Sequence, residues 1–77
     1  MFDQALYEKI QADKRLMNRL TWEAANGKKI SAEKAARGII EHPRRSRRFY
    51  KLFPEADASS LIQTVKRILI ELKDWEV

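Results

Sequence analysis

The chain has 77 residues, and among them are no cysteine, one histidine, two glycines and two prolines. Because the chain has no cysteine, it can form no disulfide bond and offers no thiolate metal ligand and no thiol nucleophile. The lone His42 lacks a second imidazole or thiolate partner, so neither a zinc site nor a histidine-based catalytic pair is expected. We therefore predict a protein that uses no metal and no cofactor and that is not an enzyme.

Long apolar runs are absent as well. No run approaches the roughly 20 apolar residues that a helix needs to cross a bilayer. The N-terminus begins with Asp3 close to its start and lacks the basic and apolar regions of a signal peptide. We expect no membrane association, and the absence of cysteine fits a reducing compartment, so we predict a cytoplasmic location.

Apolar residues recur at helical spacing through most of the chain, and no segment shows strand-like alternation. This pattern predicts an all-α fold: a compact four-helix domain, single over residues 1–77, with helices near 2–25, 32–41, 43–53 and 58–75. Ser31 and Asp57 are suitable N-caps, and Pro43 and Pro54 bracket the third helix. Asp13 and Lys14 interrupt the apolar stripe of the first helix, which indicates either a bend or contact with water on that side.

The excess positive charge is concentrated between Pro43 and Pro54. This segment holds five basic residues and no acidic one, whereas the rest of the chain has 11 of each, so it accounts for the net charge of +5. On a helical wheel Arg45 lies at the boundary between two opposite arcs. The basic arc, called the basic ridge below, contains Arg44, Arg47, Arg48 and Lys51. The opposite arc contains Phe49, Tyr50, Leu52 and Phe53, which we expect to be buried.

Arginine predominates in this segment, and its guanidinium group binds phosphate or carboxylate through paired hydrogen bonds. We expect the free backbone N–H groups at the start of the third helix to favour an anion too. Basic residues just upstream would extend the surface if the intervening turn folds beside it. The candidate binding residues are Arg44, Arg45, Arg47, Arg48, Lys51, Lys28, Lys29, Lys34 and Arg37.

Two functional hypotheses stay open beside the plain interpretation that the segment is only a solvated face. The first is a small protein that binds nucleic acid, DNA or RNA, mainly through the phosphate backbone. It would be a transcription regulator of the compact kind that phages and plasmids encode, with a helix-turn-helix-like middle. The alternative is a protein-binding adaptor or inhibitor whose basic ridge docks on an acidic partner protein. The sequence does not separate them, because phosphate and carboxylate both bind arginine.

Two apolar features predict further contacts. The last helix carries a heptad-like seam that is long enough to pack on the first helix or to form a homodimer with a second subunit. This seam contains Leu61, Val65, Ile68, Leu72 and Trp75. Trp22 lies off the apolar stripe of the first helix. It is either buried by the second and third helices, which we favour, or exposed as a contact residue.

Overall fold

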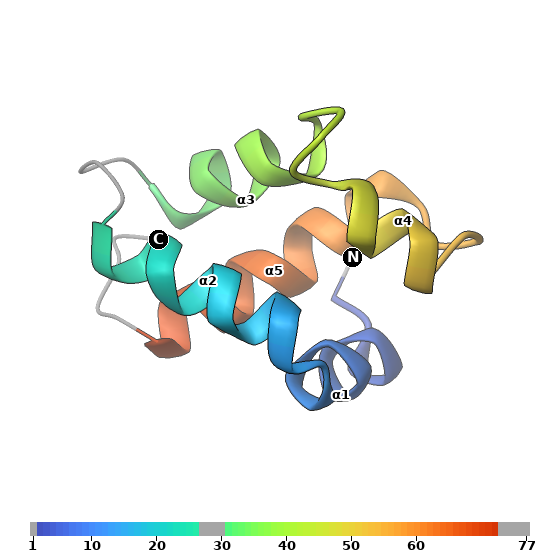
Figure 1. Ribbon diagram of the computed structural model, residues 1–77, viewed down its shortest axis with the longest axis horizontal. Coiled ribbons are helices and arrows are strands. Elements are labelled where there is room, and N and C mark those ends of the chain that lie inside the picture. Colours follow the sequence, from blue (N-terminus) through green and yellow to red (C-terminus); the bar gives the residue numbers. More distant parts are fainter. Residues whose placement is uncertain (1, 27–30, 73–77) are drawn as a thin grey trace.

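The computed structural model describes residues 2–26 and 31–72. Within these ranges the chain forms five helices and no strand, which confirms the all-α class but not the number of helices (Figure 1). The helices are α1 (Gln4–Ala12), α2 (Lys14–Asn26), α3 (Ala32–Ile40), α4 (Arg47–Leu52) and α5 (Ala58–Leu72).

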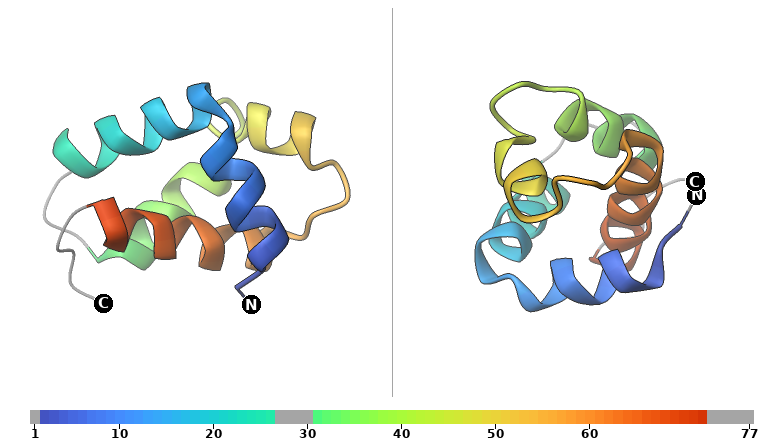
Figure 2. Two further views of the ribbon diagram at one scale, coloured as in Figure 1. Left: turned by 90° about the horizontal axis from the view of Figure 1, so that it is seen from below. Right: turned by 90° about the vertical axis from the view of Figure 1, so that its right-hand side faces the viewer.

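Helix α5 forms the centre of the core. It contributes six buried residues, and α3, α1 and α2 all pack against it. Both views of Figure 2 show α2 and α4 on one side of the molecule and α5 on the opposite side. The outward surfaces of α2 and α4 therefore face the same general direction.

The predicted first helix is in fact two helices, α1 and α2, which separate at Asp13. The backbone of Asp13 is extended, with φ −92° and ψ 110°, so the helical hydrogen-bond ladder stops there. Its carboxylate then accepts a hydrogen bond from the Leu16 backbone N–H at 2.9 Å, as an N-cap does. The sequence indicated only an interruption of one helix here, because α1 and α2 both turn their apolar sides to one core and so form one continuous stripe.

The predicted third helix, 43–53, is also shorter than expected. Helix α4 covers only Arg47–Leu52, and residues 42–46 form turns. The ring nitrogen Nδ1 of His42 accepts the backbone N–H groups of Arg44 and Arg45 at 3.1 and 3.2 Å. These two N–H groups are therefore already bonded and are not free to bind a phosphate at the predicted start of the helix.

The other helix boundaries follow the predicted caps. Ser31 Oγ accepts the Lys34 N–H at 3.2 Å at the start of α3, and Asp57 accepts the Ser60 N–H at 2.7 Å near the start of α5. These bonds satisfy donors that the first turn of a helix leaves free. The predicted end of the last helix near residue 75 lies outside the described residues.

The predicted dimer seam is not a free surface. Leu61 and Val65 are fully buried within the single chain, and Ile68 is 1% exposed. Leu72 is 38% exposed, and Trp75 lies outside the described residues. Most of the described seam is therefore core, because the other helices of the same chain already cover it.

The aromatic side of the basic segment is only partly buried. Phe49 is completely enclosed in the core, whereas Tyr50 and Phe53 are half-buried against it. Leu52 is 40% exposed and Trp22 is 59% exposed, so the predicted burial of these two side chains is wrong. Leu52 is the last residue of α4, whose one buried residue is Phe49. Helix α2 turns Trp22 away from its buried stripe of Leu16, Leu20 and Ala24.

Candidate functional site

The five basic side chains of residues 44–51 fall into two groups. Arg48 and Arg45 form ion pairs with acidic residues at opposite ends of the α2 region, Asp13 and Glu23. Arg44, Arg47 and Lys51 are exposed, and none of them forms an ion pair with another described residue. The basic ridge is therefore not uniform: Arg48 belongs to an internal contact, and three cations stay free.

The pair between Arg48 and Asp13 is bidentate. Arg48 Nε donates to Asp13 Oδ1 at 3.1 Å, and Nη2 donates to Oδ2 at 2.9 Å. The bonds from Arg48, together with the bond from the Leu16 N–H, lower the pKa of the Asp13 carboxyl. The bonds to Asp13 raise the pKa of Arg48. One carboxylate thus caps α2 and attaches α4 to it.

The second pair joins the turn before α4 to the C-terminal half of α2. Arg45 contacts Glu23, whose side chain is mostly buried at 12% exposure. Burial lowers the pKa of Arg45, and the nearby positive charge of Arg19 lowers it further. The effect of Arg19 places one α2 cation near Arg45.

A pH-dependent loss of stability should follow from the Asp13 contact. Because folding lowers the pKa of Asp13, its contribution is present above the unfolded value of about 3.9 and is lost as pH falls through the folded value. Asp13→Asn keeps an N-cap side chain but removes the charge that Arg48 binds. We expect this variant to melt below the parent at about pH 7 and the gap to close as the pH falls through the lowered pKa of Asp13.

Thermal unfolding at several pH values measures this effect. Glu33 and Asp57 also have lowered pKa values, so the parent will lose stability in acid at these residues too. The difference between parent and variant isolates Asp13 from them. A difference in melting temperature that stays constant across the whole pH range would show that the charge of Asp13 contributes nothing to stability.

Helix α2 adds exposed cations that the sequence analysis did not include. Lys14, Arg15 and Arg19 are exposed and form no ion pair with another described residue. We call the combined set of free cations from α2 and from residues 42–53 the basic face. It consists of Lys14, Arg15, Arg19, Arg44, Arg47 and Lys51.

These two segments together carry the positive excess of the chain, and two ion pairs join them. Residues 13–26 and 42–53 hold eight basic and two acidic residues, while the remainder of the chain holds eight basic and nine acidic. The two acidic residues are Asp13 and Glu23, and both are bound by Arg48 and Arg45. Both carboxylates of these segments are therefore bound internally and do not compete with an external anion for the cations. Six cations of the two segments stay unpaired among the described residues.

The sequence signal for the α2 cations was weak. They are spread over six positions and have Asp13 and Glu23 close by, so the stretch has little excess charge when read linearly. Their helical spacing placed them off the apolar stripe, which was the one available indication that they face solvent.

Of the four upstream candidates, the structure describes two, Lys34 and Arg37, and both lie on α3. Lys28 and Lys29 lie outside the described residues, and Lys34 is exposed on α3. Arg37 lies between Glu33 and Glu41, at 3.4 and 3.5 Å, and Glu33 also pairs with Lys66 at 3.6 Å. Arg37 is thus held in a network of both signs and is not a free cation.

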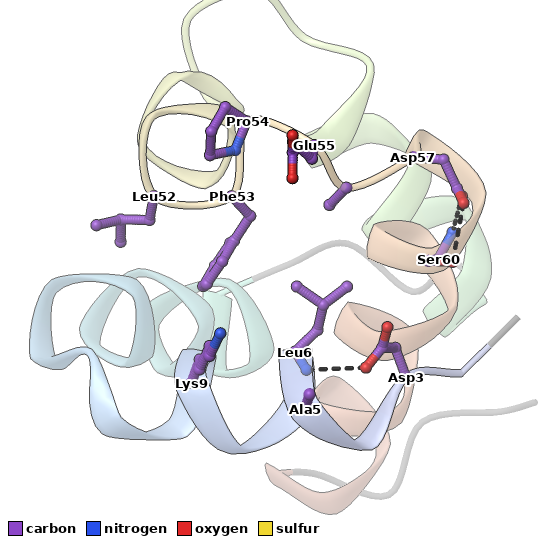
Figure 3. Close-up of a pocket in the computed structure, with 11 residues that line it drawn as sticks. Asp3, Ala5, Leu6, Lys9, Leu52, Phe53, Pro54, Glu55, Asp57 and Ser60 are labelled. Carbon is purple, nitrogen blue, oxygen red and sulfur yellow. Dashed lines mark hydrogen bonds between the residues drawn. The ribbon is translucent and has the colours of Figure 1, made fainter.

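A pocket of about 390 Å³ lies between α1 and the connection from α4 to α5 (Figure 3). Lys9 is its one cation among three carboxylates, and two of these, Asp3 and Asp57, are occupied as helix caps. An anion would meet net negative charge there, so the pocket is separate from the basic face. Its walls are formed by Asp3, Ala5, Leu6, Lys9, Leu52, Phe53, Pro54, Glu55, Ala56, Asp57 and Ser60.

The described residues contain no group of three or more side chains suited to hold a metal ion. Among the helices of these residues, none combines the length and apolar character required to cross a membrane. Comparison of the chain with family models, curated proteins and solved structures gave no match.

Proposed function

We propose that this protein binds nucleic acid through its phosphate backbone, using the basic face. The observation that carries the proposal is the set of six exposed, unpaired cations on α2 and residues 42–53, beside which both acidic groups are neutralised internally. Each phosphate contact releases condensed counterions, which is the main source of backbone-directed affinity.

The basic face is better suited to contact the phosphate backbone of a nucleic acid than to read the edges of its bases. Helix α4 has six residues and is about 9 Å long, so it offers little length for insertion into a major groove. The free side chains are lysine and arginine, with Asn18 as an exposed amide on α2. We accordingly propose a binder with low sequence preference. Regulation of transcription, a helix-turn-helix arrangement and a cytoplasmic location stay predictions.

A titration at two salt concentrations tests the proposal. Labelled DNA and RNA of about 15 nucleotides, single-stranded and duplex, are titrated with the full chain at about 50 and about 200 mM salt. We expect binding that weakens steeply with salt, because six phosphate contacts correspond to a loss of about 10³ in affinity across this range. No binding to any of these ligands at the lower salt would refute the proposal.

The same titration distinguishes an acidic protein partner. Carboxylates accept the same hydrogen bonds from arginine as phosphates do. Poly-glutamate of matched charge is therefore included as a competitor. Tight binding to poly-glutamate together with no binding to nucleic acid would favour the adaptor hypothesis.

A further inference from the structure

Trp22 is the most exposed of the large apolar side chains among the described residues. It is 59% exposed, compared with 40% for Leu52 and 38% for Leu72. Tryptophan has a large apolar surface that small proteins usually cover, and an exposed ring in a charged setting is a common feature of binding surfaces.

The neighbours of Trp22 on α2 are polar or basic. With 3.6 residues per turn, Arg15 lies two turns before Trp22 on the same stripe, and Asn18 and Arg19 lie one turn before it. All three are exposed. The buried residues of α2 lie on the opposite side of the helix. The indole ring is thus on the solvent side, beside two unpaired guanidinium groups.

This stripe reaches the turn before α4, to which Arg45 belongs. The positive charge of Arg19 is close enough to lower the pKa of Arg45. Arg45 in turn forms an ion pair with Glu23, the residue that follows Trp22 in the sequence. Both views of Figure 2 show α2 and α4 on the same side of the molecule. A chain of phosphates that follows the basic face would therefore pass beside the Trp22 ring.

We propose that Trp22 is a stacking site for an unpaired nucleobase, so that the ligand is single-stranded nucleic acid. This inference rests on the proposed function and adds the form of the ligand. In a duplex the faces of the bases are already stacked, whereas a single strand presents them to an aromatic ring. Arg15 and Arg19 then contact phosphates next to the stacked base, and the ring adds affinity that does not depend on salt.

Tryptophan fluorescence tests this directly. The chain has two tryptophans, so a Trp75→Phe background leaves Trp22 as the single reporter. Single-stranded oligonucleotides and duplexes of equal charge are titrated into this protein. We expect quenching of the Trp22 emission by the single strand, tighter binding of the single strand than of the duplex, and no quenching by the duplex.

Trp22→Ala and Trp22→Phe separate stacking from charge. We expect Trp22→Ala to weaken single-strand binding about tenfold or more, with the salt slope and the duplex affinity unchanged. Trp22→Phe should recover part of the loss, because phenylalanine also stacks. Both variants should melt close to the parent, since the ring is exposed.

The outcomes separate this inference from the proposed function. If the parent binds neither single strands nor duplexes at low salt, the proposed function fails. If it binds both forms equally, without quenching, or if Trp22→Ala binds single strands as the parent does, the function stands and the stacking site is refuted. Quenching by poly-glutamate without quenching by any nucleic acid would assign the Trp22 surface to a protein partner and also overturns the inference.

Discussion

Replacement of Arg44, Arg47 and Lys51 by glutamine should lower affinity for nucleic acid by about 100-fold, at roughly 1 kcal/mol for each lost contact. The slope of log affinity against log salt should fall by about 2–3, since each phosphate contact contributes about 0.7–0.9. The fold should be retained, because these side chains are exposed and form no ion pair with another described residue.

The matched control removes the same number of charges elsewhere. Lys9, Lys34 and Arg37 lie on α1 and α3, and two of them were candidates from the sequence. If their replacement by glutamine weakens binding as much as the first variant does, net charge alone determines affinity and the basic face has no special role.

A third variant of equal charge tests the contribution of α2. Replacement by glutamine of Lys14, Arg15 and Arg19 should lower the slope of log affinity against log salt by a similar amount, again about 2–3. Unchanged binding in this variant would restrict the interface to residues 44–51, as the linear sequence indicates, and would remove α2 from the basic face.

Phe49→Ala should give the largest loss of stability, about 3–5 kcal/mol in the free energy of unfolding. Phe49 is fully buried, and it is the one residue of α4 that is buried. This loss is a large share of the roughly 5–15 kcal/mol that a native domain has in total. Denaturant unfolding followed by circular dichroism measures it, and any loss of binding should parallel the unfolded fraction.

Leu52→Ala is the matched control for this prediction. Leu52 lies in the same helix but is 40% exposed, so its replacement should change the free energy of unfolding by about 0.5 kcal/mol or less. Similar destabilisation by the two changes would mean that α4 is held by its whole apolar side and not by Phe49. A Phe49→Ala protein as stable as the parent would contradict the burial of this ring.

The two classes of arginine should also behave differently. Arg48 and Arg45 hold the 42–53 segment against α2, so their replacement should lower stability as well as binding. Arg44 and Arg47 should affect binding alone. The sequence analysis grouped Arg48 with the free cations because a helical wheel reports only direction around one helix and contains no information about an acidic partner elsewhere.

The sequence by itself determined the helical class, the caps at Ser31 and Asp57 and the segment that carries the excess charge. Apolar spacing, N-cap chemistry and charge density act within a few residues, so they can be read along the chain. The break at Asp13 was visible as an interruption of the stripe, but its geometry depends on a carboxylate that also binds Arg48, 35 residues away.

Only the tertiary structure decided which cations are free and which large apolar side chains are covered. Arg45 and Arg48 are neutralised by residues of another helix, and Trp22 and Leu52 are exposed because no other element lies over them. Pairing and burial of this kind depend on the relative placement of helices that are distant in the sequence. That placement is set by the packing of α1, α2 and α3 against α5, and local periodicity does not encode it.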